Sequence, residues 1–158
     1  MRRSEIYENE LFLWGTGFLI PKSLVACLDG QSSLRNGLEK MRNRGYTAMP
    51  VISKNGVYLG TVTEGDFLWF LLDHKDCEIK SLEKFCVSDV MRPNWNPPAK
   101  ASETIYEVFA KLKDQNFVPV VDDRDVFVGI VTRRAVLDHC EIVSNEKKPN
   151  PLHNFQTI

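Results

Sequence analysis

Metal motifs, paired cysteines and long apolar runs are all missing from this chain of 158 residues. Its three histidines and four cysteines show neither CxxC spacing nor any metal-ligand pattern, so we expect no bound metal. Reduced thiols of this kind are typical of a cytoplasmic protein. The longest uninterrupted apolar run, residues 67–72, falls far short of the roughly 18 residues that a membrane span needs. We therefore expect a soluble protein that makes no membrane contact.

The sequence also lacks an excess of charge and any catalytic signature. Lys and Arg number 20 against 21 Asp and Glu, so the net charge of −1 gives no general attraction for nucleic acid. There is no P-loop, no Ser-x-x-Lys and no Gly-x-Ser-x-Gly nucleophile motif. The apolar stretch at residues 11–20 follows acidic residues, contains glycines and ends in Pro-Lys, which is not the arrangement of a secretory signal. We expect neither catalysis nor secretion.

What the chain does contain is an internal repeat. Residues 46–67 read YTAMPVISKNGVYLGTVTEGDF, and residues 116–136 read NFVPVVDDRDVFVGIVTRRAV. A constant spacing of 69 residues separates three pairs, Pro50–Pro119, Gly60–Gly129 and Thr63–Thr132. Upstream the spacing becomes 71, because the second copy lacks two residues before its proline. One supersecondary unit has therefore been built twice, and two halves this small are expected to share a core.

Each copy predicts the same order of elements: a short extended segment, an amphipathic helix, two apolar strands and a second helix. The first helices have apolar residues at helical spacing behind a serine, Ser33 or Ser102, which we expect to cap them. Asn55-Gly56 predicts a tight hairpin between the strands, and Asp125 takes the place of the glycine in the second copy. The fold class is therefore α+β, with two β-α-β-β-α units. The expected ranges are 25–28, 33–43, 48–53 and 57–62 in the first copy, and 96–98, 101–114, 118–122 and 126–131 in the second.

The second helices carry more apolar residues than one face can bury. Residues 67–72 surround most of one helix, and a stripe on the other consists of Val136, Leu137, Cys140 and Val143. One face is expected to pack on its own sheet. The other packs either on the sister copy or on a second copy of the chain, and the latter arrangement predicts a homodimer.

These residues resemble a known family. The sequence RGYTAMPV at residues 44–51, a hairpin, and GTVTEGD at residues 60–66 are similar to the cystathionine-β-synthase (CBS) repeat. The segments FLIP at 18–21 and DVMRP at 89–93 are similar to the entry segments of such repeats. Two repeats in tandem resemble a Bateman module, a single pseudo-two-fold unit.

The resemblance also implies where the repeats begin and end. It assigns residues 18–86 to repeat 1 and residues 87–144 to repeat 2. Before them lies an N-terminal segment, residues 1–17, which we expect to be helical. After them lies a polar tail, residues 145–158, which we expect to be mobile.

The resemblance implies regulatory binding of adenine nucleotides in clefts between the repeats. The family motif of Gly, two residues, Thr or Ser, two residues and Asp supplies a hydroxyl for phosphate and a carboxylate for ribose at a strand-to-helix turn. The first copy has the complete motif, Gly60, Thr63 and Asp66, whereas the second ends in Ala135. Two arginines follow the threonine of the second copy, so we expect that cleft to bind mainly the phosphate of a nucleotide rather than its ribose.

In CBS pairs the threonine turn of one repeat faces the extended segment and first strand of the other, which implies two clefts. The second cleft is the less favoured, because its base-binding wall is two residues shorter. The resemblance places in the main nucleotide cleft Val25, Ala26, Tyr46, Thr47, Ala48, Met49, Thr132, Arg133 and Arg134. It places in the second cleft Thr63, Asp66, Asn96, Pro97, Phe117 and Val118.

Each of these assignments has a structural alternative. A threonine at a strand-to-helix turn is commonly an N-cap without a ligand, and Asp66 can serve the first turn of its own helix. Adjacent arginines are often solvated or paired with carboxylates. Tyr46 can either stack on a base or pack in the core.

The function predicted from these features is that of a regulatory adenine-nucleotide sensor. A charged hydrogen bond contributes about 1.5–3 kcal/mol and the stacking of one base about 1–3 kcal/mol, which favours an anionic nucleotide over a neutral nucleoside. Stand-alone bacterial CBS pairs with a similar Gly-Tyr-Thr-Ala strand and Thr-Arg-Arg turn bind cyclic di-AMP, so the resemblance makes it the preferred ligand, with AMP, ADP and ATP still open. The sensor is expected to be a homodimer that signals to an unidentified effector protein. The alternative is a ligand-free structural or interaction module that dimerises and binds a partner.

Overall fold

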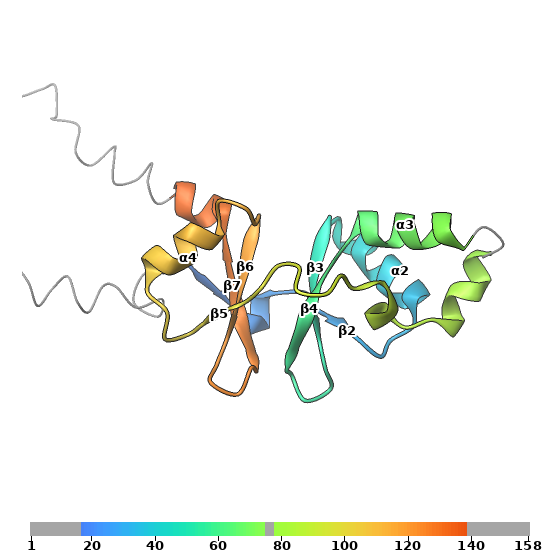
Figure 1. Ribbon diagram of the computed structural model, residues 1–158, viewed down its shortest axis with the longest axis horizontal. Helices are drawn as coiled ribbons and strands as arrows, with labels where there is room; N and C mark the ends of the chain where they lie inside the picture. The colour runs from blue at the N-terminus through green and yellow to red at the C-terminus, as the bar shows by residue number, and fades with distance from the viewer. Residues whose placement is uncertain (1–16, 75–77, 139–158) are drawn as a thin grey trace, which may run out of the picture.

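The computed structural model describes residues 17–74 and 78–138, and within them both repeats adopt the β-α-β-β-α order (Figure 1). The expectations for the N-terminal helix and for the mobile tail lie outside the described residues. The first unit consists of β2 (Leu28–Asp29), α2 (Leu34–Arg44), β3 (Ala48–Ile52), β4 (Tyr58–Thr63) and α3 (Glu64–Asp73). The second consists of β5 (Ala99–Lys100), α4 (Ile105–Lys111), β6 (Phe117–Val121), β7 (Phe127–Thr132) and a helix at residues 133–138. The remaining elements are β1 (Leu19–Pro21) and three short 3₁₀ helices, η2 (Lys22–Leu24), η3 (Ile79–Lys84) and η4 (Val87–Val90).

The strand registers confirm the predicted repeat. Ala48 pairs with Thr63 in the first hairpin, and Phe117 pairs with Thr132 in the second. Both hairpins also have an irregularity at the same place, between residues 51 and 52 and between residues 120 and 121. Equivalent residues therefore hold equivalent positions, 69 apart in the sequence.

The two sheets meet in the middle of the molecule, and the α-helices lie on their outer sides (Figure 1). The hairpins are joined directly, because Tyr58 N–H donates to the carbonyl of Asp125 at 2.9 Å and Phe127 N–H donates to the carbonyl of Gly56 at 2.9 Å. The buried apolar side chains form two clusters, one in each repeat, rather than the single shared core that we expected. The reason is that each sheet buries its outer face under its own helices.

Strand β1 crosses from the first repeat to the sheet of the second. It pairs antiparallel with β7, which gives the strand order β1-β7-β6-β5 beside a separate sheet β2-β3-β4. Gly129 permits this crossing, because a Cβ atom at that position would lie 2.3 Å from the carbonyl oxygen of Ile20. The crossing brings the entry segment of repeat 1 against the strand that ends at Thr132.

The helix caps are partly as expected. Ser33 caps α2, since its hydroxyl accepts from Asn36 N–H at 3.2 Å. The prediction that Ser102 caps the next helix is wrong. Thr104 is the cap, because it forms a reciprocal capping box with Glu107 in which Thr104 N–H donates to the carboxylate at 2.7 Å. These hydrogen bonds hold the pKa of Glu107 below its ordinary value.

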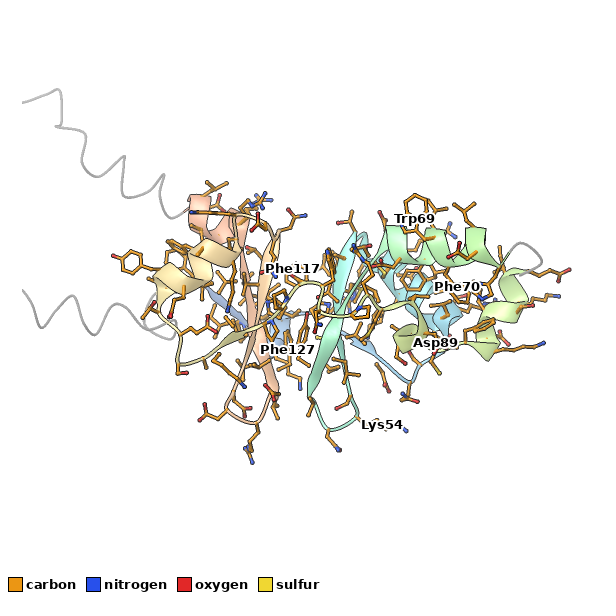
Figure 2. The ribbon with its side chains drawn as sticks, in the orientation of Figure 1. Lys54, Trp69, Phe70, Asp89, Phe117 and Phe127 are labelled. Carbon is orange, nitrogen blue, oxygen red and sulfur yellow. The ribbon has the colours of Figure 1, made fainter. Side chains whose placement is uncertain are left out.

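Helix α3 has one buried and one exposed apolar face. Phe67 is fully buried, and Phe70 packs edge-on against Phe85 with ring centroids 4.9 Å apart. The exposed fractions of Leu68, Trp69 and Leu72 are 52%, 60% and 55%, and Trp69 points away from the body of the protein (Figure 2). The sister repeat therefore does not cover this face, and the homodimer remains a prediction. Two residues of the apolar stripe predicted for the second helix of repeat 2, Cys140 and Val143, lie outside the described residues. Within residues 17–74 and 78–138, no helix is long and apolar enough to cross a bilayer.

Candidate functional site

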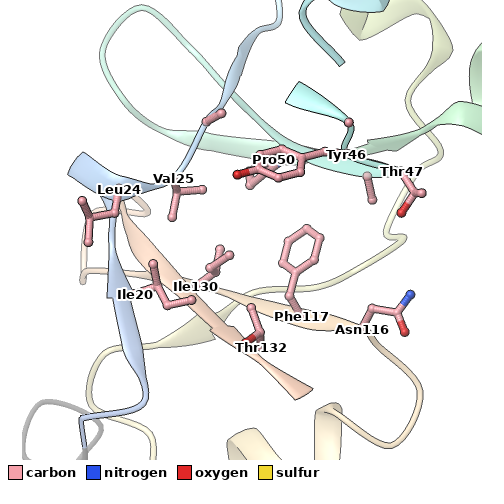
Figure 3. A pocket seen from close by; sticks show the side chains of 13 residues that line it. Ile20, Leu24, Val25, Tyr46, Thr47, Pro50, Asn116, Phe117, Ile130 and Thr132 are labelled. Carbon is pink, nitrogen blue, oxygen red and sulfur yellow. The ribbon is translucent and has the colours of Figure 1, made fainter. Parts of the chain in front are cut away.

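The main cleft lies between the two sheets and has a volume of about 380 Å³. Figure 3 shows Val25, Tyr46 and Pro50 on one wall and Ile20, Ile130 and Thr132 on the other. Phe117 projects from β6 into the space between the walls (Figure 3). The cleft has the size of a small-molecule site, and both repeats contribute to it.

Six of the nine residues predicted for the main cleft line it: Val25, Ala26, Tyr46, Thr47, Ala48 and Thr132. Met49 does not, because successive side chains on a strand point to opposite faces and Met49 is fully buried in the first core. The lining residues that the prediction missed are Ile20, Leu24, Gly45, Pro50, Asn116, Phe117 and Ile130. The alternation of β6 and β7 is a signal that could have placed Phe117 and Ile130 on the cleft face, opposite the buried Val118 and Val131.

The end of α2 presents the ring of Tyr46 to the cleft. Gly45 adopts the left-handed conformation, with φ 66°, and ends the helix with N–H bonds to the carbonyls of Arg42 and Met41. Tyr46 follows at once and keeps 46% of its surface exposed. Its ring is therefore not core packing, and it remains free to stack on a planar ligand opposite Phe117.

Thr132 and Thr63 both serve as N-caps. The hydroxyl oxygen of Thr132 accepts from Ala135 N–H at 3.1 Å, and that of Thr63 accepts from Asp66 N–H at 3.3 Å. The alternative that these threonines cap their helices is thus observed. Capping uses the oxygen as acceptor, and the hydroxyl proton of Thr132 remains able to donate to a phosphate oxygen.

The two arginines lie outside the lining of the main cleft and differ from each other. The guanidinium of Arg133 donates to the carbonyl of Leu112 at 2.9 and 3.1 Å, to that of Gln115 at 3.0 Å and to that of Lys113 at 3.3 Å. Arg133 thus ties down the turn after α4. The side chain of Arg134 is 90% exposed and has a distant partner, Asp138, at 3.7 Å. Among the described residues, Arg134 is therefore the less constrained of the two arginines.

The second cleft has a volume of about 300 Å³. Of its six predicted residues, Thr63, Asn96 and Phe117 line it. Pro97 lines a neighbouring cavity of about 280 Å³, and Val118 is fully buried. Gln115 stands where the main cleft has Tyr46, 69 residues earlier, so this cleft lacks the equivalent aromatic wall.

Asp66, which was also predicted for the second cleft, does not line it: its side chain is buried, with 3% exposed. One carboxylate oxygen accepts from the N–H and the hydroxyl of Thr63, both at 2.7 Å. The other lies 2.7 Å from Nε of Arg92. Asp66 thus serves the first turn of its own helix, which was the alternative to ribose binding. It also has an ion-pair partner, Arg92, that the sequence did not indicate.

No group of His, Cys, Asp and Glu within the described ranges is arranged to hold a metal ion. Cys27 and Cys86 are free thiols, and burial raises the pKa of Cys27. The chemistry that the main cleft offers is therefore apolar and aromatic contact, together with the hydroxyl of Thr132.

Comparison with known proteins gives a consistent result. The CBS domain family matches residues 20–73 and 87–141, which together are more than half of the chain. Cyclic di-AMP receptor B of Bacillus subtilis (strain 168) is 28% identical over 120 residues, which cover 76% of this chain and 81% of that protein.

Two solved structures extend the comparison. The CbpB protein of Listeria monocytogenes in complex with c-di-AMP has a TM-score of 0.73 and 28% identity, over 82% of this chain and 96% of that chain. Another CbpB in complex with c-di-AMP has a TM-score of 0.79 over 90% of this chain and 94% of that chain. Its identity is 21%, so it shows the shared fold alone.

Proposed function

This chain belongs to the CBS domain family, and we propose that it is a regulatory receptor that binds an anionic adenine nucleotide in the main cleft. The observation that carries the proposal is the pairing of Tyr46 and Phe117 across an open cleft of about 380 Å³. Flat apolar walls suit a purine base. The receptor acts by binding and carries out no reaction.

We propose cyclic di-AMP as the preferred ligand, with AMP, ADP or ATP as weaker ligands. The lining of the main cleft contains no charged side chain, so a base and ribose occupy it while the phosphates lie at the rim. There the hydroxyl of Thr132 and the exposed guanidinium of Arg134 offer a donor and a positive charge. Cyclic di-AMP receptor B and the CbpB structure in complex with c-di-AMP support this choice.

The receptor is proposed to act as a homodimer that signals to an effector protein. The exposed apolar face of α3 supports the dimer, because Leu68, Trp69 and Leu72 lie together on one element. A ligand that touches both repeats can change their relative arrangement and hence any surface that the dimer offers to a partner.

Calorimetry with cyclic di-AMP, AMP, ADP and ATP tests the proposed function. Tyr46→Ala should weaken cyclic di-AMP by about 1–3 kcal/mol, or roughly 5- to 150-fold, because one stacking surface is lost. Tyr46→Phe keeps the ring and should bind like the unmodified protein. Tyr106→Ala is the matched control, since Tyr106 is 70% exposed on α4 and lines neither cleft.

Two results would contradict the proposal. One is the absence of binding heat with every nucleotide, which would favour the ligand-free interaction module. The other is equal affinity of Tyr46→Ala and Tyr106→Ala for cyclic di-AMP, which would place the ligand elsewhere.

A further inference from the structure

Arg92 lines the cavity of about 280 Å³ beside the second cleft, whereas the lining of the main cleft contains no charged side chain. Nε of Arg92 lies 2.7 Å from the buried carboxylate of Asp66, and its guanidinium carbon lies 3.9 Å from the centroid of the Trp95 ring. The second oxygen of Asp66 accepts two hydrogen bonds from Thr63. Both carboxylate oxygens are thus engaged, and an aromatic ring covers the cation from the outside.

The segment that carries Arg92 is fixed by its own hydrogen bonds. Asn94 and Asn96 adopt left-handed conformations, with φ 54° and 59°. The buried side-chain amide of Asn96 donates to the hydroxyl of Thr61 at 3.0 Å, and the backbone carbonyl of Asn96 accepts from the hydroxyl of Tyr58 at 2.9 Å. Arg92 is therefore held against Asp66 by a turn that is anchored to β4.

The equivalent pair in the main cleft is apolar. Ile20 and Arg92 each directly precede the proline of an entry segment, and Ala135 stands 69 residues after Asp66. Ile20 lines the open main cleft. The two clefts therefore differ at the same pair of positions, where one has a charged pair and the other has small or aliphatic side chains.

We propose that Arg92 closes the second cleft to nucleotides, so that the chain binds nucleotide through the main cleft alone. A ribose needs a carboxylate that accepts its hydroxyl protons, and Arg92 occupies the face of Asp66 that a ribose would approach. Removal of Arg92 frees that oxygen and uncovers the Trp95 ring for stacking. Arg92 is thus the residue that sets how many nucleotides a chain holds, an inference that rests on the proposed function.

Equilibrium dialysis with AMP tests this by counting bound nucleotide per chain. The unmodified protein should bind about one AMP, and Arg92→Ala should bind about two. Arg35→Ala is the matched control, because Arg35 pairs with Glu39 and Glu83 on a surface outside both clefts, and it should bind about one. The added AMP should quench the fluorescence of Trp95, and this quenching should disappear when Trp95→Phe is added to Arg92→Ala.

Arg92→Ala leaves Asp66 buried without its cation, and the variant can fail to fold for that reason. Arg92→Ser is a second variant, because its short polar side chain leaves room for water beside the Asp66 carboxylate and keeps the carboxylate that the ribose needs; it should also bind about two AMP. The proposal is overturned if the unmodified protein binds two AMP, or if the folded variants bind no more AMP than the unmodified protein. If the unmodified protein binds no AMP, the calorimetry with cyclic di-AMP decides the proposed function separately, and a gain of one AMP in Arg92→Ala would still support the closure of the second cleft.

Discussion

The adjacent arginines at residues 133 and 134 should separate into a structural residue and a ligand-binding residue when each is replaced alone. Arg133 donates to carbonyl oxygens of Leu112, Lys113 and Gln115, in the turn that ends α4. Carbonyls at the end of a helix have no helical partner, so Arg133→Ala leaves them to water. Arg134→Ala removes a side chain that is 90% exposed and whose partner among the described residues, Asp138, lies 3.7 Å away.

The magnitudes follow from these contacts. A hydrogen bond to a charged group contributes about 1.5–3 kcal/mol, and a cation near a helix C-terminus about 0.3–1 kcal/mol. Because Arg133 is partly exposed, we expect its loss to lower the free energy of unfolding by about 2 kcal/mol, which corresponds to a Tm about 4–8 °C lower for a chain of this size. Arg134→Ala should change the free energy of unfolding by less than about 0.5 kcal/mol.

Thermal unfolding without nucleotide, followed by calorimetry with cyclic di-AMP, measures both effects. Arg134→Ala should keep the Tm and weaken cyclic di-AMP about tenfold or more, with a smaller dependence on salt. Arg133→Lys is a useful intermediate, since an ammonium reaches one carbonyl but cannot span three. An unchanged Tm for Arg133→Ala, or full cyclic di-AMP affinity for Arg134→Ala, would refute this division of roles.

Two further predictions concern assembly and pH. Trp69→Asp should convert the dimer into a folded monomer of 18.1 kDa, as measured by light scattering. Phe70→Asp should instead unfold the protein, because Phe70 packs on the core. A monomeric unmodified protein would exclude the dimer. Burial raises the pKa of Tyr58 to about 12 in the folded protein, compared with about 10 in the unfolded chain. The protonated phenol therefore contributes about 2–3 kcal/mol to the free energy of unfolding below pH 10, and this contribution is lost as the pH rises through 12. Urea unfolding of Tyr58→Phe should lack this loss between pH 10 and 12, and an identical pH dependence in both proteins would contradict it.

The repeat and the element order could be predicted from local signals in the sequence, whereas the residues of the main cleft were placed by the family resemblance. Strand alternation and the constant spacing of Pro50, Gly60 and Thr63 from their counterparts fix equivalent places in both halves. The cap at Thr104 was also within reach, since Thr104 and Glu107 have the spacing of a capping box. The sequence also predicted that α3 carries more apolar residues than one face can bury, and the structure shows the surplus as an exposed face.

Contacts between residues distant in sequence could not be predicted in the same way. Nothing near Arg133 in the chain indicates that its partners are carbonyls about 20 residues earlier, because backbone groups leave no compositional trace. The pairing of Arg92 with Asp66 depends on the left-handed turn at Asn94 and Asn96, which brings the segment against β4. The placement of Phe117 in the main cleft follows only once the two sheets face each other.

The asymmetry of the two clefts bears on how a nucleotide could act as a signal. On one side the repeats are joined by the Arg92–Asp66 pair and by the hydrogen bond between Tyr58 and the carbonyl of Asn96. On the other side the main cleft is open, and its walls come from both halves. A ligand shifts the arrangement of the halves only to the extent that it binds one arrangement better, and a tenfold preference supplies about 1.4 kcal/mol. We therefore expect such a shift to open or close the main cleft by a rotation of the two repeats about the Arg92–Asp66 contact. This rotation would move the exposed faces of α3 and of the helix at residues 133–138 relative to each other.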